Sequence, residues 1–398
     1  MYPTLTLLEG KESSVIFGHP WIFSGALQKS SKSVPHGSFV HVLNFNGEII
    51  ATGSYSSHGS IAVRVFDRQE VMIDSSWLER RLRQCLVRRK LMGFGPGTLT
   101  TGYRLVFGES DGIPGLVVDC YEETIVFQIA TAALDRLRDQ IVKALVAVFS
   151  PNVLIERSDI ASRSEEGLED VVKVHLGEDP GAVSFLENGV MFSTEPFTGQ
   201  KTGFFLDQKN LRQWILEHSS VFKGGKVLNV FSYTGSAGIV AMKSGAQKVL
   251  NVDSSQTALE GCLAQAQLND LRAGVFDIQK ADGFQFLSQA PERSCDVVIV
   301  DPPALIKSRR DTEEGKKAYH FLNRAAMRLV KDGGVLITSS CSHFLSEEDF
   351  IFLLRRGSIQ TGCRLETLAA LGQSMDHPTS IYFPESKYLK TFCFQVNR

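Results

Sequence analysis

Residues 226–253 read KVLNVFSYTGSAGIVAMKSGAQKVLNVD, and this stretch decides the fold of the C-terminal half of the chain. Two apolar runs flank a turn that contains Gly235 and a short helical pattern, and the same alternation continues downstream. The predicted elements are, in chain order, strand Lys226–Phe231, helix Ser236–Ser244, strand Lys248–Asp253, helix Ser254–Asn269, strand Asp277–Ala281, a further helix, strand Asp296–Asp301, helix Glu313–Val330 and strand Val335–Ser340. This alternation predicts an α/β fold in which helices cover both faces of a parallel sheet.

Polar residues follow the ends of these strands, where ligands bind in parallel sheets. The first turn is not a G-x-G-x-x-G dinucleotide motif, because Phe231 and Tyr233 stand where that motif has small residues. Asp253 ends the second strand, where a carboxylate can accept both hydroxyls of a ribose, and Asp282 follows the third, where it can accept from an exocyclic amine. A single aspartate at a strand end usually caps the next helix. Several in register with a glycine turn favour a ligand site.

The next two strand ends carry an acid and a thiol. The fourth strand ends in Asp301-Pro-Pro-Ala304, a rigid extended edge that suits a flat ring. The fifth runs into Thr338-Ser-Ser-Cys341-Ser342. A cysteine at a strand end is most often a small apolar core residue. The polar neighbours of Cys341 instead predict an exposed loop, in which a thiolate can act as a nucleophile.

Composition limits the class of protein. The chain has 398 residues, 43% hydrophobic and 22% charged, which excludes disorder and coiled coil, and its longest apolar runs are too short to span a membrane. Residues 1–10 have no basic segment of the kind that begins a signal peptide, so we expect a cytoplasmic protein. The seven cysteines form no C-x-x-C pair and no disulfide framework, and we expect no metal site.

The N-terminal half has a different pattern. Residues 1–73 contain short alternating segments and an Asn46-Gly47 turn, which predicts a small all-β module. Residues 74–92 predict a helix that carries six cations between Arg80 and Lys90. These charges can line one exposed face that contacts a polyanion, or they can form an ordinary solvated helix face. The middle predicts a small α+β unit with strand Leu116–Asp119, strand Thr124–Ala130, helix Ala132–Phe149 and strand Val153–Arg157.

Together these motifs resemble those of class I S-adenosylmethionine-dependent methyltransferases. They are most similar to the bacterial large-subunit ribosomal-RNA cytosine-C5 methyltransferases, through Gly18-His-Pro-Trp-Ile-Phe23, Thr202-Gly-Phe-Phe-Leu-Asp-Gln208, Asn229 to Gly238, Asp301-Pro-Pro, Ser340-Cys-Ser and Pro384-Glu-Ser-Lys-Tyr-Leu389. The resemblance implies a PUA-like RNA-binding β-barrel over residues 1–73, a central strand-strand-helix-strand-strand domain over 74–187, and a Rossmann-like methyltransferase domain over 188–398. The family commonly has arginine after Asp207-Gln208, whereas Lys209 keeps the charge without the bidentate geometry.

The same resemblance implies the cofactor and the chemistry. S-adenosylmethionine would be held by Phe231, Tyr233, Gly235, Asp253, Ser254, Asp282, Gly283 and Asp301. The Cys341 thiolate would add to C6 of cytosine, and Asp301 would bond the pyrimidine edge at N3. Many RNA cytosine-C5 enzymes have a second cysteine after the proline of the Asp-Pro motif. Pro303 and Ala304 stand there in this chain, so the sequence names no base for the final proton removal.

Two alternatives stay open at this point. Asp301-Pro-Pro also resembles the motif of methyltransferases that act on exocyclic amines, although Ala304 stands where an aromatic residue would stack on the base. A catalytically silent RNA-binding factor for ribosome assembly would keep the fold without the activity. The expected partner is large-subunit ribosomal RNA. The sequence leaves a homodimer open and predicts no membrane association.

Overall fold

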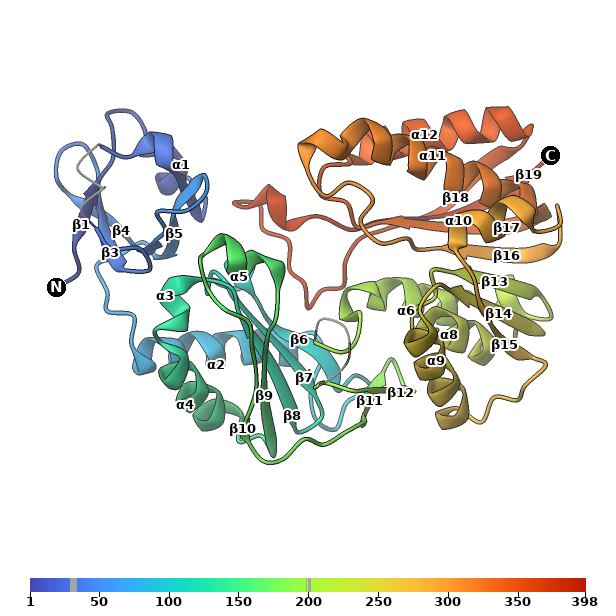
Figure 1. Ribbon diagram of the computed structural model, residues 1–398, viewed down its shortest axis with the longest axis horizontal. Helices are drawn as coiled ribbons and strands as arrows, with labels where there is room; N and C mark the ends of the chain where they lie inside the picture. Colours follow the sequence, from blue (N-terminus) through green and yellow to red (C-terminus); the bar gives the residue numbers. More distant parts are fainter. Residues whose placement is uncertain (29–33, 198, 200–201) are drawn as a thin grey trace. The chain divides into compact units, whose positions relative to one another are not determined.

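The computed structural model describes residues 1–28, 34–197, 199 and 202–398, which form two compact units (Figure 1). The first unit comprises Met1–Gly189, Thr194–Leu206 and Met375–Ser386. The second comprises Val190–Ser193, Asp207–Ser374 and Lys387–Arg398. The division into three domains at residues 73 and 187 stays a prediction.

The second unit is built on a seven-stranded sheet with strand order β15-β14-β13-β16-β17-β19-β18. Its strands are β13 Lys226–Val230, β14 Lys248–Asp253, β15 Phe276–Lys280, β16 Cys295–Val300, β17 Val330–Ser340, β18 Arg364–Leu371 and β19 Lys390–Asn397. Buried aliphatic side chains such as Leu228, Val298 and Leu336 form its core. The Rossmann-like α/β architecture predicted from the strand and helix alternation is therefore confirmed.

Helices cover both faces of this sheet, as predicted. Figure 1 shows α10, α11 and α12 over one face and α6, α8 and α9 over the other. Their bounds, with the one-turn α7, are α6 Lys209–Glu217, α7 Ser219–Phe222, α8 Ser236–Lys243, α9 Gln256–Leu268, α10 Gly283–Gln289, α11 Thr312–Leu329 and α12 Glu347–Thr361.

The parallel sheet predicted for the five strands between Lys226 and Ser340 is confirmed, and two further strands extend it at one edge. Strands β15, β14, β13, β16 and β17 are parallel, but β19 is antiparallel to both β17 and β18. The connection from β18 to β19 contains only the one-turn helix η6, Pro384–Ser386. A parallel return needs a crossover of a dozen or more residues, usually a helix, so a chain without that helix returns in the opposite direction.

The first unit contains two five-stranded sheets. One has the order β1-β3-β4-β5-β2 and the other β10-β9-β8-β7-β6. The predicted Asn46-Gly47 turn joins β3 to β4, with Gly47 at a φ of 86°. The strands and short helices are β1 Thr4–Thr6, α1 Ser13–Ile16, β2 Trp21–Phe23, β3 Phe39–Leu43, β4 Ile49–Tyr55, β5 Ile61–Asp67, β6 Gly102–Phe107, β7 Leu116–Tyr121, β8 Thr124–Ile129, β9 Val153–Ser158, α5 Ala161–Glu165, β10 Val171–Leu176 and β11 Val183–Glu187. The next strand along the chain is β12, Val190–Thr194, of which Val190–Ser193 belong to the second unit.

The single helix predicted over Ala132–Phe149 is wrong, because the chain forms two helices there. These are α3, Ala132–Asp135, and α4, Arg138–Phe149. Leu137 between them has a φ of −96° and a ψ of 9°, outside the helical region. The Asp135 carboxylate accepts hydrogen bonds from the guanidinium groups of Arg138 and Arg163, which stabilises the break.

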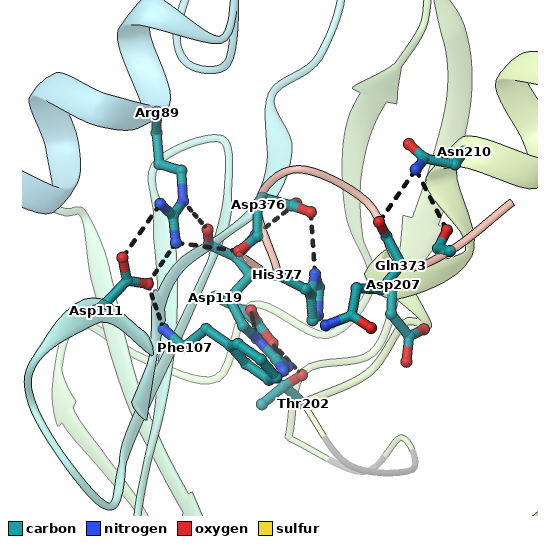
Figure 2. Close-up of polar contacts among 12 residues, drawn as sticks. Arg89, Phe107, Asp111, Asp119, Thr202, Asp207, Asn210, Gln373, Asp376 and His377 are labelled. Carbon is teal, nitrogen blue, oxygen red and sulfur yellow. Dashed lines mark hydrogen bonds and ion pairs between the residues drawn. The ribbon is translucent and has the colours of Figure 1, made fainter. Parts of the chain in front are cut away.

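The basic helix is α2, Ser75–Leu91, capped by Asp74, whose side chain accepts from Trp77 N. The prediction that its charges line one exposed face holds for Arg80, Arg83 and Lys90 but is wrong for Arg89. Figure 2 shows why: the buried Arg89 guanidinium pairs with the buried Asp111 carboxylate and donates to the Asp376 carbonyl over 3.0 Å. A buried cation needs such partners, so Arg89 serves the core of the first unit.

Two motifs from opposite ends of the chain pack together in this unit. The Trp21 and Phe383 rings meet edge to face, with centroids 4.7 Å apart, and His19 Nε2 lies 3.3 Å from a Glu385 carboxylate oxygen. A Cβ on Gly18 would lie 2.7 Å from the Tyr382 ring. The Gly18–Phe23 motif and the segment that ends at Ser386 therefore pack against each other within the first unit.

Candidate active site

The strand register of the second unit brings the predicted residues to one edge of the sheet. Val230 pairs with Val252 and Val300, and Val300 pairs with Thr338. The loops that leave β13, β14, β16 and β17 therefore start side by side at the carboxyl end, where parallel sheets bind ligands.

The turn after β13 has a strained backbone. Phe231 and Tyr233 have φ angles of 61° and 49°, in the left-handed region that glycine favours. Gly235, at a φ of 73°, caps α8, and a Cβ there would lie 2.3 Å from Cys262 Sγ. Such strain costs about 1–3 kcal/mol per residue and is often found at functional sites. The turn needs glycine at 235 and orients two aromatic residues at the edge of the sheet.

Asp253 is held by this turn. Its Oδ2 accepts from Tyr233 N over 2.8 Å and its Oδ1 accepts from Ser255 N over 2.9 Å. A carboxylate has about four lone-pair sites, so a group with two amide partners can still accept ligand hydroxyls. Ser254 beside it is exposed.

A buried polar atom in the same turn gives an independent test of whether a polar ligand fits. The Ser232 hydroxyl is buried and has no hydrogen-bond partner among the described residues. Buried hydroxyls without partners are costly and are usually satisfied by a ligand or water. The donors and acceptors of this turn therefore fit a polar cofactor such as S-adenosylmethionine.

Asp282 is the N-cap of α10, and its Oδ1 accepts from Gln285 N over 2.9 Å. The carboxylate is exposed. Gly283 is buried, and a Cβ there would lie 2.5 Å from the Phe231 ring. The helix-capping role of Asp282 is thus present in the structure, and its role toward a ligand stays a prediction.

Asp301, directly after β16, is half-buried and is oriented by a side chain far away in the sequence. Gln208 Nε2 donates to Asp301 Oδ2 over 2.8 Å. Pro302 is buried beside it and Pro303 is exposed. The sequence indicated Gln208 only as part of a motif and assigned it no role.

Cys341 lies beside this acidic loop. Its half-buried Sγ is 4.0 Å from the Pro302 carbonyl oxygen. The next residue fixes the two loops together: Ser342 Oγ accepts from Ile306 N over 3.1 Å and lies 2.9 Å from Tyr319 Oη. The thiol and the Asp301 carboxylate are therefore carried by two loops that share a hydrogen-bonded support.

The remaining cysteines are less suited to nucleophilic chemistry. Burial raises the pKa of the Cys85 thiol to about 11 and the pKa of the thiols of Cys120, Cys262 and Cys393 to about 12. Cys363 is also buried. Cys295 is half-buried, but it begins β16 and so lies at the opposite, amino end of that strand.

In the described part of the chain, no group of three or more His, Cys, Asp and Glu side chains is arranged to hold a metal ion. None of its helices is both long and apolar enough to cross a membrane.

Comparisons with known proteins bear on both units. Residues 5–68 match a PUA-like domain and residues 168–356 match an S-adenosylmethionine-dependent methyltransferase. The ribosomal RNA large subunit methyltransferase I of Vibrio cholerae is 35% identical over 406 residues, covering 100% of both chains. The protein of the same name from Aeromonas salmonicida is 36% identical over 389 residues, covering 96% of this chain and 97% of its own. This chain belongs to the ribosomal RNA large subunit methyltransferase I family.

Membership of the ribosomal RNA large subunit methyltransferase I family confirms the fold and the cofactor predicted from the motifs. The methyl donor is S-adenosylmethionine. A solved chain from Streptococcus mutans described as a SAM-dependent methyltransferase has the same fold, with a TM-score of 0.84 at 22% identity, over 99% of this chain and 100% of that one.

The sequence analysis assigned no role to four residues that lie at or beside the candidate site. Gln208, Tyr319, Ser342 and Lys390 contact or support the two loops that carry Asp301 and Cys341. Gln208 and Ser342 lie within quoted motifs, and Lys390 directly follows one. Motif membership marked three of these positions or their neighbours, but no sequence signal marked Tyr319.

Proposed function

We propose that this enzyme methylates C5 of a cytosine in large-subunit ribosomal RNA through a covalent bond between Cys341 and C6 of the base. The observation that carries the proposal is the juxtaposition of a half-buried thiol with the Asp301 loop, 4.0 Å from the Pro302 carbonyl. The names of the relatives support ribosomal RNA as the substrate.

The chemistry explains why a thiol is needed. Cytosine C5 is too electron-poor to take a methyl group directly, so the Cys341 thiolate first adds to C6 and the C5–C6 electron pair makes C5 nucleophilic. S-adenosylmethionine, when bound, supplies the electrophilic methyl group. Loss of the C5 proton to a base then expels the thiolate and restores the aromatic ring.

Asp301 takes the second role. Its carboxyl group would bond the pyrimidine edge at N3 and stabilise the charge that develops there when the thiolate adds. The Gln208 hydrogen bond supports this role. It fixes the position of Asp301 Oδ2 and thereby the orientation of the whole carboxyl group. Groups aimed in advance at developing charge give larger rate effects than groups that must reorient.

The cofactor would be held by the turn after β13 and the strand ends beside it. We propose that Asp253 accepts the ribose hydroxyls, with Phe231, Tyr233 and Gly235 shaping the turn. Ser254, Asp282, Gly283 and Asp301 complete the proposed set. The hydrogen bonds that Asp253 accepts from two backbone amides support its assignment, since they hold the carboxylate in one orientation.

RNA contact is proposed for the first unit as well. The match to a PUA-like domain and the exposed cations Arg80, Arg83 and Lys90 of α2 support this role. Arginine and lysine side chains on an exposed helix face can bind backbone phosphates without reading sequence.

The deciding experiment replaces Cys341 by alanine. Methylation of RNA from cells that lack the gene should be abolished, while cofactor affinity and melting temperature stay nearly unchanged, because the thiolate acts on the base. RNA with 5-fluorocytosine at the target should trap a covalent complex with the wild type, since fluorine cannot leave as a proton. Cys295→Ala, which removes the other half-buried thiol, is the matched control and should still form the adduct. Full activity without Cys341, or an adduct on another cysteine, would overturn the proposal.

A further inference from the structure

Lys390 is a buried cation at the edge of the catalytic site. It is the first residue of β19 and pairs in register with Ser340, the last residue of β17. The residue is 8% exposed, and Nζ donates to the Ser342 carbonyl over 2.9 Å. The ammonium group is thus bonded to the residue that directly follows Cys341.

Burial of this amine has a cost. Desolvation lowers the pKa of Lys390 from its usual value near 10.5 to about 8, so the group is still mostly protonated at pH 7. The unfolded chain binds the Lys390 proton more tightly than the folded chain does. Lys390 therefore destabilises the folded state fully below pH 8, and this destabilisation disappears as the pH rises from about 8 to 10.5. A buried, charged group that opposes folding at neutral pH is a candidate for a functional role.

The charged and titratable neighbours of Lys390 show which group its ammonium charge can affect. Cys341, in the loop after β17, and Glu347, in the first turn of α12, both favour the ammonium form, and Lys387 opposes it. Glu347 is already paired with the exposed Lys387 over 3.0 Å. Tyr319, of α11, is buried and its raised pKa keeps it neutral at pH 7. Cys341 is therefore the neighbour whose charge state can respond to the ammonium group.

We infer that Lys390 is a positioning residue for Cys341: its ammonium group holds the Ser342 carbonyl and favours the thiolate over the thiol. The S–H bond of Cys341 breaks, the proton passes to water, and the ammonium group stabilises the anion left behind. Opposite charges that approach closely at a partly desolvated site favour the ionised form of each. The inference rests on the proposed nucleophilic role of Cys341.

The test measures alkylation of Cys341 by iodoacetamide as a function of pH, with the modified peptide identified by mass spectrometry. Lys390→Met should move the midpoint of this pH dependence upward by about one unit, which means about tenfold slower alkylation below the midpoint. Lys390→Gln, which keeps a donor for the Ser342 carbonyl without the charge, should shift it by a similar amount. Lys390→Arg should restore most of the wild-type midpoint.

Two controls accompany the measurement. Lys387→Met removes an exposed cation nearby and should leave the midpoint unchanged, and alkylation of Cys295 serves as an internal reference in every variant. If Lys390→Met is too unstable to measure, Lys390→Gln decides. An unshifted midpoint in the neutral variants would overturn the inference.

Activity separates this inference from the proposed function. In Lys390→Met, kcat should fall about 10- to 100-fold at pH 7, recover partly toward pH 9, and leave KM for S-adenosylmethionine unchanged. If Cys341→Ala remains active, the nucleophile assignment fails, even if the Lys390 variants, which retain Cys341, show the shifted alkylation midpoint. If Cys341→Ala is inactive and the shift is absent, only the role of Lys390 fails.

Discussion

At the ends of β14 and β15, the carboxylates of Asp253 and Asp282 accept hydrogen bonds from backbone amides. At the ends of β16 and β17, the loops that carry Asp301 and Cys341 are instead held by side chains. The partner of Asp301 is Gln208, 93 residues away, and the partner of the Ser342 carbonyl is Lys390, 48 residues away. Backbone amides hold a carboxylate in one orientation and do not titrate. Side-chain partners can also adjust the charge and orientation of a reacting group.

This difference predicts that the two halves of the edge respond differently to substitution. We call the strand ends with Asp253 and Asp282 the cofactor half, because we propose that they bind S-adenosylmethionine; loss of a side chain there should weaken cofactor binding and leave the rest of the site in place. We call the loops with Asp301 and Cys341 the catalytic half; loss of a distant partner there should lower turnover even when cofactor affinity is unchanged.

The largest effect concerns Asp301 and its partner. Asp301→Asn should lower kcat about 100- to 1,000-fold, the range for loss of one group aimed at developing charge. Gln208→Leu removes only the orienting hydrogen bond and should lower kcat about tenfold with an unchanged melting temperature. Single-turnover methylation at saturating cofactor measures both. A Gln208→Leu enzyme with wild-type turnover would show that the catalytic half does not depend on its distant partner.

An intermediate effect is expected at Asp253. Asp253→Ala should weaken S-adenosylmethionine binding by about 1–3 kcal/mol, because it leaves ligand and backbone groups without their acceptor. Isothermal titration calorimetry measures this directly. Asp277→Ala is the matched control, since Asp277 lies in β15 and its carboxylate pairs with Lys248 over 2.8 Å. Equal affinities of the Asp253→Ala variant and the wild type would remove Asp253 from the cofactor site.

The smallest effect separates two roles of Asp282. Asp282→Ser keeps a side-chain acceptor for Gln285 N and removes the carboxylate, while Asp282→Ala removes both. Only the alanine variant should lose stability, by about 0.5–2 kcal/mol in urea denaturation. Both variants should bind the cofactor a few-fold more weakly if the carboxylate faces it. Unchanged affinity in the serine variant would leave Asp282 as a helix cap alone.

Local patterns in the sequence determined most of the fold. The alternation of apolar runs and helical periods placed β14 at Lys248–Asp253 and the other strands of the parallel part within a few residues, with β17 beginning earlier than predicted. The Asn46-Gly47 turn and the helical pattern of residues 74–92 placed a hairpin and a helix in the first unit. These features depend on neighbouring residues, because side-chain periodicity and turn geometry act over a few positions. For the same reason, Asp253, Asp301 and Cys341 could be assigned to one edge of the sheet before their partners were known.

The distant residues that complete that edge are brought there by tertiary packing alone. The antiparallel entry of β19 brings Lys390 beside the Cys341 loop, and the path of the chain after Leu206 brings Gln208 to Asp301. The sequence likewise read Arg89 as one of six surface cations, whereas its partner Asp111 and its burial come from packing. Contacts across such separations depend on how whole elements are ordered in the sheet, and a local pattern carries no information about that order. The sequence thus identified the chemical groups at this edge, and folding alone brought near the residues that hydrogen-bond to them or to their loops.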